Sequence, residues 1–216
     1  MSKLIHAIFV KDEAHCIDTM LDSILPYVDD SYIMVDDRTT DNTKEIVEDR
    51  GCHTKMFTFS NFSKTKNTLL KWVTDKTDWI IGIAPDETIR SDFGEMLRTL
   101  VDKLELSTYD CVRFPRRHWK DLEMKNEYTC QHWYPDFQAR LLRADYPRIH
   151  MINYVHEIVQ GVRKTLQVND FDIHHFNIYY KARINYDWGA MNKLYNELKI
   201  RHRREGGRDI WPNEDD

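Results

Sequence analysis

Short apolar runs alternate with segments of helical apolar spacing through the first 90 residues. Residues 4–10 form an apolar run, and the apolar residues between Ile17 and Leu25 then recur every three or four positions, as on one face of a helix that Pro26 ends. Two parallel strands must be joined by a crossover, which is usually a helix. The alternation therefore predicts an α/β fold with a mostly parallel central sheet and helices on both of its faces.

The remaining elements follow from the same pattern. In the first half, strands are expected at 32–35, 55–59 and 79–83, and helices from a cap at Asp41 or Asn42 to Gly51 and from Phe62 to Lys76. After residue 90 we expect helices at 91–100 and 187–202, strands at 111–114, 137–142 and 155–159, and an irregular stretch at 116–135. We predict a single domain over residues 1–216, with a nucleotide-binding half at 1–90 and a more variable, mixed half at 91–216.

Glycine is scarce in this chain, which limits how it can hold a phosphate. There are only seven glycines, and no two of them stand in a G-x-G relation. Dinucleotide-binding G-x-G-x-x-G loops and G-x-x-x-x-G-K-[ST] phosphate loops both need glycine where the backbone closes on phosphate. A bound nucleotide must therefore have its phosphates neutralised in another way.

Composition excludes several other classes of protein. A formal net charge of -5 argues against nucleic acid as the main partner. No apolar run approaches the roughly 18 residues of a membrane span, and the first residues turn charged too early for a signal peptide. The four cysteines lie far apart without a CxxC pair, as is typical of a reducing compartment. We expect a cytoplasmic protein.

Polar and charged residues follow each of the first four expected strands. These residues are Lys11 to Glu13, Asp36 to Thr43, Ser63 to Asn67, and Ala84 to Glu87. Ligands of open α/β sheets bind at the carboxyl ends of the strands, so all four segments converge on the edge where a ligand site is expected. The alternative is that they are ordinary polar surface loops.

Asp86 and Glu87 are candidates for a metal site. They end an apolar strand at the same edge as Asp36 and Lys66. Mg²⁺ and Mn²⁺ prefer oxygen ligands, often one or two carboxylates together with substrate phosphates. Taken alone, the pair is better explained as an ordinary acidic pair that leads into a helix. Its position favours the metal.

Five segments, taken in order, resemble glycosyltransferases of family 2, which have the GT-A fold. The run VKDEAHCIDTMLDSILPYVDDSYIMVDDRTTDNTKEI resembles the family's V-K-N-E, L-x-S-I and V-D-D-x-S-T-D-x-T motifs. FSNFSKTKNTLL resembles its F-x-x-A-R-N segment, and DWIIGIAPDE resembles its metal motif D-W-I-L-x-L-D-A-D-E. The later PDFQARLLR and YVHEIV resemble segments of the family's acceptor half. The resemblance is strong over residues 4–90 and weaker to about residue 187.

The resemblance implies a role for particular residues. The base pocket would be lined by residues 7–10, and the donor nucleotide would contact Val10, Lys11, Glu13, Asp36, Asp37, Arg38, Lys66 and Asn67. Asp86 would ligate a divalent metal, Mn²⁺ or Mg²⁺, with His156 or His174 as the remaining ligand. Asp136 would be the general base that deprotonates the acceptor hydroxyl. Asp145 and Glu157 are its nearest rivals.

One position departs from the family pattern. The first aspartate of the metal motif is Ala84 in this chain. The second carboxylate of such a motif is usually the direct ligand, so Asp86 can still serve. The loss puts in question how tightly the metal is held, together with any ribose contact of the missing carboxylate.

The sequence thus predicts a metal-dependent, inverting hexosyl- or deoxyhexosyltransferase that uses a UDP-sugar donor and a glycan or another hydroxyl acceptor. A nonenzymatic nucleotide-sugar or glycan-binding module is the first alternative, because of Ala84. A sugar nucleotidyltransferase is the second, although such enzymes use a glycine-rich loop that this chain lacks. The compact chain also resembles soluble transferases of large algal viruses, which would place it in the host cytoplasm.

Overall fold

The computed structural model describes residues 1–129 and 134–207 and shows a single α/β domain. In this part of the chain, a nine-stranded sheet has the order β3-β2-β1-β4-β7-β6-β11-β5, with β10 paired to β6. Its strands are β1 (Leu4–Val10), β2 (Asp30–Asp36), β3 (His53–Phe57), β4 (Trp79–Ile81), β5 (Glu87–Thr88), β6 (Cys111–His118), β7 (Asp136–Arg143), β10 (Thr165–Gln167) and β11 (Ile173–His175). The strands β8 (His150–Ile152) and β9 (Ile158–Gln160) form a separate antiparallel pair.

The first half is the predicted parallel arrangement. Strands β1, β2, β3 and β4 are mutually parallel, and Ile8 of β1 lies opposite Ile33 of β2. The helices between them are α1 (Ile17–Ile24), α2 (Thr43–Asp49) and α3 (Phe62–Val73), with short 3-10 turns at Leu25–Tyr27 and Thr74–Lys76. Gly51 has a φ of 72°, as expected for the residue that ends a helix. The prediction of an α/β fold with a mostly parallel sheet is confirmed.

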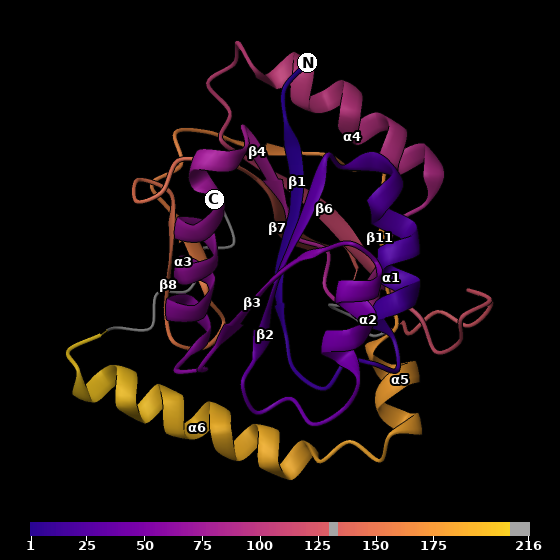
Figure 1. Cartoon of the computed structure of the whole chain (residues 1–216), viewed down its shortest axis with the longest axis vertical. Helices are drawn as coiled ribbons and strands as arrows, with labels where there is room; N and C mark the ends of the chain where they lie inside the picture. The colour runs from indigo at the N-terminus through magenta and orange to yellow at the C-terminus, as the bar shows by residue number, and fades with distance from the viewer. Residues whose placement is uncertain (130–133, 208–216) are drawn as a thin grey trace.

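Helices cover both faces of the sheet because the strands of the first half are apolar on both faces (Figure 1). On one face, α1, α2 and α4 (Ser91–Leu104) pack on a core that contains Ile8, Trp79 and Phe114. On the other face, α3 packs through Leu69, Leu70 and Val73 on alternate residues of β1 and β2. Packing in these two cores fixes the strands, so the loops that follow the parallel strands β1, β2 and β4 lie at the same edge of the sheet.

The second half differs in detail from the sequence prediction. Strand β6 continues to His118, into the stretch expected to be irregular, and residues 130–133 of that stretch lie outside the described residues. The expected strand at 155–159 is β9 at Ile158–Gln160 instead. Strands β8, β10 and β11 and helix α5 (Asn177–Arg183) were not predicted, because segments of three to seven residues carry little periodic signal.

Two features of the second half shape the site. Strand β11 runs between β6 and β5, so its residues reach the loop that follows β4. Helix α6 (Trp188–Arg204) begins with Asp187 as its cap and crosses the end of the sheet toward which β1 and β2 run (Figure 1). None of the helices in the described ranges combines the length and apolar character that a bilayer span requires.

Candidate active site

A cavity of about 500 Å³ opens at the carboxyl ends of β1 and β2. Its walls come from these strand ends, from the loop after β4, and from α5, α6 and the segment between them. Six of the residues predicted to bind nucleotide or metal line it together: Val10, Lys11, Glu13, Asp36, Arg38 and Asp86. The structure thus gathers most of the predicted first-half residues around one space.

Asp36 is held by Arg38 in a two-pronged ion pair. The Arg38 Nε donates to Oδ1 at 2.9 Å and the terminal nitrogen donates to Oδ2 at 2.6 Å. Asp36 is the last residue of β2 and only 2% exposed, while Arg38 is exposed at the cavity wall. Burial favours the neutral acid, but the bonds from Arg38 outweigh it and lower the pKa of Asp36. Asp36 is therefore an ionised acceptor in the cavity.

Asp86 faces an imidazole that the sequence did not identify. Its Oδ2 lies 3.2 Å from Nε2 of His175. Successive side chains of a strand point to opposite faces, so His174 points away from Asp86, and its Nδ1 accepts a hydrogen bond from the Trp119 indole instead. His156 is exposed and packs on Tyr195. The structure thus brings His175, rather than His156 or His174, to Asp86.

A chain of hydrogen bonds continues from His175 to Asp136. Nδ1 of His175 lies 2.9 Å from Nδ1 of His118, and Nε2 of His118 lies 3.2 Å from Oδ2 of Asp136. Arg116 donates to the same Oδ2, and Gln138 donates to Oδ1. Burial opposes ionisation of Asp136, but His118 and Arg116 outweigh it and hold its pKa well below the usual range. A carboxylate held in this way is a weak base, which argues against the predicted general-base role.

Glu87, the neighbour of Asp86, points into the protein. Its side chain is fully buried and accepts hydrogen bonds from Arg116 and Arg140, while its Oε2 accepts from the backbone N–H of Ala84 at 2.9 Å. Burial favours the neutral acid, but the two guanidinium groups lower the pKa of Glu87. Glu87 therefore fixes the loop from Ala84 to Asp86 and does not face the cavity.

Glu13 and Lys181 lie near Asp86 in the cavity wall. Burial and then the negative charge of Asp86 raise the pKa of Glu13 to about 7. Burial lowers the pKa of Lys181, although Asp86 and Glu13 oppose that shift. The Lys181 ammonium also lies 4.5 Å from the ring centroid of Tyr186 and 4.7 Å from that of Trp188. This part of the cavity thus brings the carboxylates of Asp86 and Glu13 near the ammonium group of Lys181.

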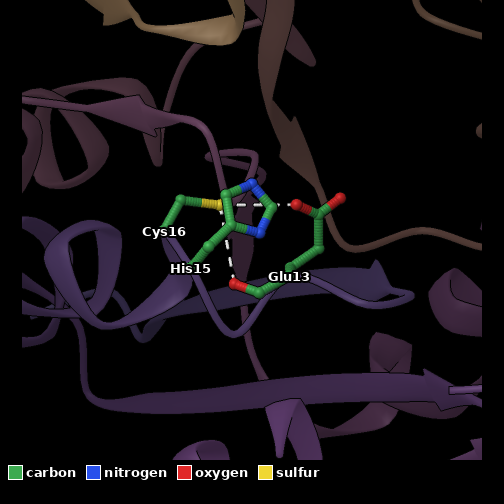
Figure 2. Close-up of side chains that lie close together, drawn as sticks. All are labelled: Glu13, His15 and Cys16. Atoms are coloured by element: carbon green, nitrogen blue, oxygen red, sulfur yellow. Dashed lines mark hydrogen bonds between the residues drawn. The ribbon is translucent and has the colours of Figure 1, made fainter. Parts of the chain in front are cut away.

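A second group of possible metal ligands lies in the turn after β1. Ligand atoms of Glu13, His15 and Cys16 come within 4.8 Å of one another (Figure 2). The Cys16 thiol donates to the Glu13 side chain at 3.3 Å, and burial followed by the charge of Glu13 raises the pKa of that thiol. A protonated thiol is a poor ligand for hard ions such as Mg²⁺ and Mn²⁺. This group therefore suits those ions less well than Asp86 and His175 do.

The Glu13 environment predicts a pH-dependent stability. The ordinary pKa is 4.5 and the folded value is about 7, so the native state binds more protons between these values and the free energy of unfolding falls as pH rises through them. The full cost, present above pH 7, is at most about 3 kcal/mol. Glu13→Gln should remove this component, as measured by denaturant unfolding at pH 5 and pH 8 in EDTA. An unchanged pH dependence in Glu13→Gln would contradict the assignment.

A smaller cavity of about 250 Å³ lies between α3 and the sheet. Phe9 and Phe62 line both cavities. Lys66 lines the smaller one and forms an ion pair there with Glu157, one of the alternative bases. Ala84, which stands at the first carboxylate position of the metal motif, also lines this cavity.

Three other candidates from the sequence make contacts of their own. In the described part of the chain, neither cavity is lined by Asp37, Asn67 or Asp145. Asp37 is exposed and accepts from Thr58, and Asp145 pairs with Arg148 at 2.6 Å. Asn67 exchanges two hydrogen bonds with the backbone of Met151, which ties α3 to β8. The Asn67 side chain therefore joins two elements of the fold.

Sequence reasoning missed three residues of the site, namely His118, His175 and Lys181. His118 lies in the stretch expected to be irregular, and the other two lie in or next to elements that were not predicted. The pair His174 and His175 did carry a signal. Because successive side chains of a strand point to opposite faces of the sheet, only one of these two histidines can face Asp86 once a strand is recognised there.

Comparisons with known proteins bear on the family and the fold of this chain. The family model described as "Glycosyl transferase family 2" matches residues 7–159. Glucosyl-3-phosphoglycerate synthase from Mycobacterium tuberculosis, in complex with Mn²⁺, uridine diphosphate and phosphoglyceric acid, superimposes with a TM-score of 0.59 at 14% identity, over 96% of this chain and 80% of that one. The same synthase with Mg²⁺ and uridine diphosphate gives a TM-score of 0.58 at 13% identity, over 96% and 81% of the two chains.

A third solved structure, S. aureus TarS, gives a TM-score of 0.55 at 14% identity. That match covers 93% of this chain but 43% of TarS, so the chain spans less than half of that protein's length. No curated protein sequence matches the chain. At identities this low, the structural likeness shows the GT-A fold.

Proposed function

Because the chain belongs to glycosyl transferase family 2, we propose that it transfers a sugar from a nucleoside diphosphate sugar, a UDP-sugar, to a hydroxyl acceptor with the help of a divalent ion. The observation that carries the proposal is the meeting of Asp86 and His175 near the wall that also holds Asp36 and Arg38. If the nucleoside of the donor binds at the Asp36 end of this cavity, the diphosphate attached to it lies toward the Asp86 end. The solved synthase complexes hold uridine diphosphate with Mn²⁺ or Mg²⁺, which supports the choice of donor and ion.

The donor atoms of Asp86 and His175 suit Mn²⁺ or Mg²⁺. Oδ2 and Nε2 are 3.2 Å apart. Neighbouring ligands of an octahedral ion with bonds of about 2.1 Å lie roughly 3 Å apart, so the pair can share one ion without rearrangement. When bound, such an ion supplies positive charge that stabilises the departing diphosphate. Glu13 is the next carboxylate in the cavity wall.

The chain's own residues would hold the donor at both ends. Ionised Asp36 accepts a hydrogen bond from the base or the ribose, while Val10, Lys11 and Arg38 line that end of the cavity. Lys181 lies at the other end, where its ammonium faces Asp86 and Glu13 and adds positive charge for the diphosphate. We accordingly propose that residues 1–90 bind the donor nucleotide and that residues 91–216 complete the donor site and bind the acceptor.

An inverting transfer needs one base on the acceptor side of the reacting carbon. We predicted Asp136 in this role from the sequence. Its two oxygens already accept hydrogen bonds from Arg116, His118 and Gln138. The proposed function therefore depends on the donor side of the site, and Asp136 is not assigned as the base.

Release of UDP tests the proposed function against a binding module that has no activity. The purified chain should release UDP from at least one UDP-sugar when Mn²⁺ is present and should stop when EDTA is added. A panel of UDP-sugars, each with GDP- and ADP-sugar controls, identifies the donor. Binding of a nucleotide sugar without any release of the diphosphate, across the panel and with simple glycan acceptors added, would favour the binding module.

A further inference from the structure

Asp86, His175, His118 and Asp136 form one continuous chain of three hydrogen-bond contacts, at 3.2, 2.9 and 3.2 Å. Its members come from four separate segments: the loop after β4, then β11, β6 and β7. Both ends of the chain are carboxylates, which accept hydrogen bonds and donate none. Both middle members are imidazoles, and each neutral imidazole carries only one N–H. The direction of the chain is therefore set by which nitrogen of each ring holds the hydrogen.

We propose that Asp136 and His118 fix the tautomer of His175, so that its Nε2 presents a lone pair beside Asp86 for the metal. In this arrangement Nε2–H of His118 donates to Asp136, and Nδ1 of His118 accepts from Nδ1–H of His175. The Nε2 of His175 and the Oδ2 of Asp86 are then two acceptors facing each other, and a divalent ion held by both would supply the positive charge that this pair lacks. The inference rests on the proposed function, because it assigns the cation to the donor site.

The reverse direction would place the two facing acceptors at the other end of the chain, between His118 and Asp136. That end does not suit a metal ion. Oδ2 of Asp136 already accepts from Nε of Arg116 at 2.8 Å and from a terminal nitrogen of Arg116 at 2.6 Å, so cationic donors occupy its lone pairs. Asp86, in contrast, lines the larger cavity, where an ion and a diphosphate can enter. The two ends thus differ in access and in charge.

Arg116 also links this chain to Glu87. It donates to Asp136 and to the fully buried Glu87, whose backbone follows directly after Asp86. Asp86 is therefore positioned twice, through His175 by way of the hydrogen-bond chain and through the backbone by Glu87. Partners that orient a metal-ligating histidine typically change metal affinity or activity by about 10- to 100-fold when they are removed. We expect this range for His118.

The tautomers can be read directly by nuclear magnetic resonance. In the full chain labelled with ¹⁵N-histidine, at pH 8.5 with Mg²⁺, long-range proton–nitrogen correlations should place the hydrogen of His175 on Nδ1 and that of His118 on Nε2. A hydrogen on Nε2 of His175, or on Nδ1 of His118, would overturn the proposal. This measurement needs neither donor nor turnover, so its result is separate from that of the UDP-release test.

Two His118 variants separate positioning from a merely structural effect. His118→Phe keeps a planar ring but removes the acceptor for His175, and Mn²⁺ affinity should fall about 10- to 100-fold. His118→Asn restores an acceptor near the place of Nδ1, and its Mn²⁺ affinity should lie closer to that of the wild type. Titration followed by the paramagnetic resonance signal of free Mn²⁺ measures both. Wild-type affinity in His118→Phe, with the fold confirmed by circular dichroism, would contradict the proposal.

Asp136→Asn distinguishes the positioning role from the general-base role. The donors of Arg116 hold the asparagine oxygen in the place of Oδ2, so it still accepts from His118 and Mn²⁺ affinity should change less than about threefold. UDP release should then stay above roughly a tenth of the wild-type rate, whereas loss of a general base costs about 10²- to 10⁴-fold. A loss in that range with Mn²⁺ affinity unchanged would restore Asp136 as the base and overturn our assignment.

Discussion

Replacing Asp86 by asparagine should lower the rate of UDP release at least roughly a thousandfold while leaving the protein folded. The asparagine side chain would offer a neutral oxygen where the ion needs a charged one, and stabilisation of the departing diphosphate worth several kcal/mol would be lost. The change also removes the negative charge beside Glu13, so the pKa of Glu13 should move from about 7 toward its ordinary value. Steady-state assays at saturating Mn²⁺ measure the rate.

The matched control for this change is Asp49→Asn, an exposed aspartate at the end of α2. It makes the same chemical substitution away from both cavities, and its rate should remain that of the wild type. If Asp86→Asn and Asp49→Asn released UDP equally fast, Asp86 would have no role in the reaction. If Asp86→Asn lost its fold, its circular dichroism would reveal this before any rate was compared.

Replacing Glu87 by glutamine should destabilise the protein by about 3–5 kcal/mol, because breaking a buried ion pair leaves charge without a partner. Arg116 and Arg140 both donate to this fully buried carboxylate. A glutamine amide would also turn its N–H₂ group either toward the Ala84 N–H, from which Oε2 now accepts a hydrogen bond, or toward the two guanidinium groups, which are donors too. For a chain of this size the melting temperature should fall by on the order of 10 °C.

Glu45→Gln is the control for the stability measurement. Glu45 lies exposed in α2, and substitutions at such positions usually change stability by less than about 0.5 kcal/mol. Scanning calorimetry of the two variants in the same buffer makes the comparison. A melting temperature for Glu87→Gln within about 2 °C of the wild type would mean that the two arginines are stabilised without Glu87, contrary to the buried network described above.

The sequence predicted the first half of the fold because its helices and strands are long and strongly periodic. The spacing from Ile17 to Leu25 fits only a helix, and the apolar strand at Leu4–Val10 has the bounds expected of it. The second half depends on contacts distant in sequence. His175 is placed by pairing of β11 with β6 and β5, and nothing in the residues near it specifies that pairing.

The candidate site, like the fold, could be predicted only in its first half. Residues that follow apolar strands, such as Asp36 and Asp86, could be assigned to one edge of the sheet from strand order alone. The resemblance led us to expect an imidazole late in the chain as a metal ligand, and the position within the strand decides which of His174 and His175 faces Asp86. The hydrogen bonds from Arg116 and His118 to Asp136 were beyond prediction, because these two residues of β6 reach Asp136 only when β6 and β7 pair.

Thermal unfolding with nucleotide sugars tests the central claim most directly, since a ligand that binds only the native state raises the melting temperature. The chain should be scanned with UDP-sugars, with and without Mn²⁺, alongside Asp86→Asn. We predict a rise in the wild type that requires Mn²⁺ and at least one UDP-sugar together, and a much smaller rise in Asp86→Asn. If no nucleoside diphosphate sugar raised the wild-type melting temperature in the presence of Mn²⁺, the proposed metal-dependent donor site would be contradicted.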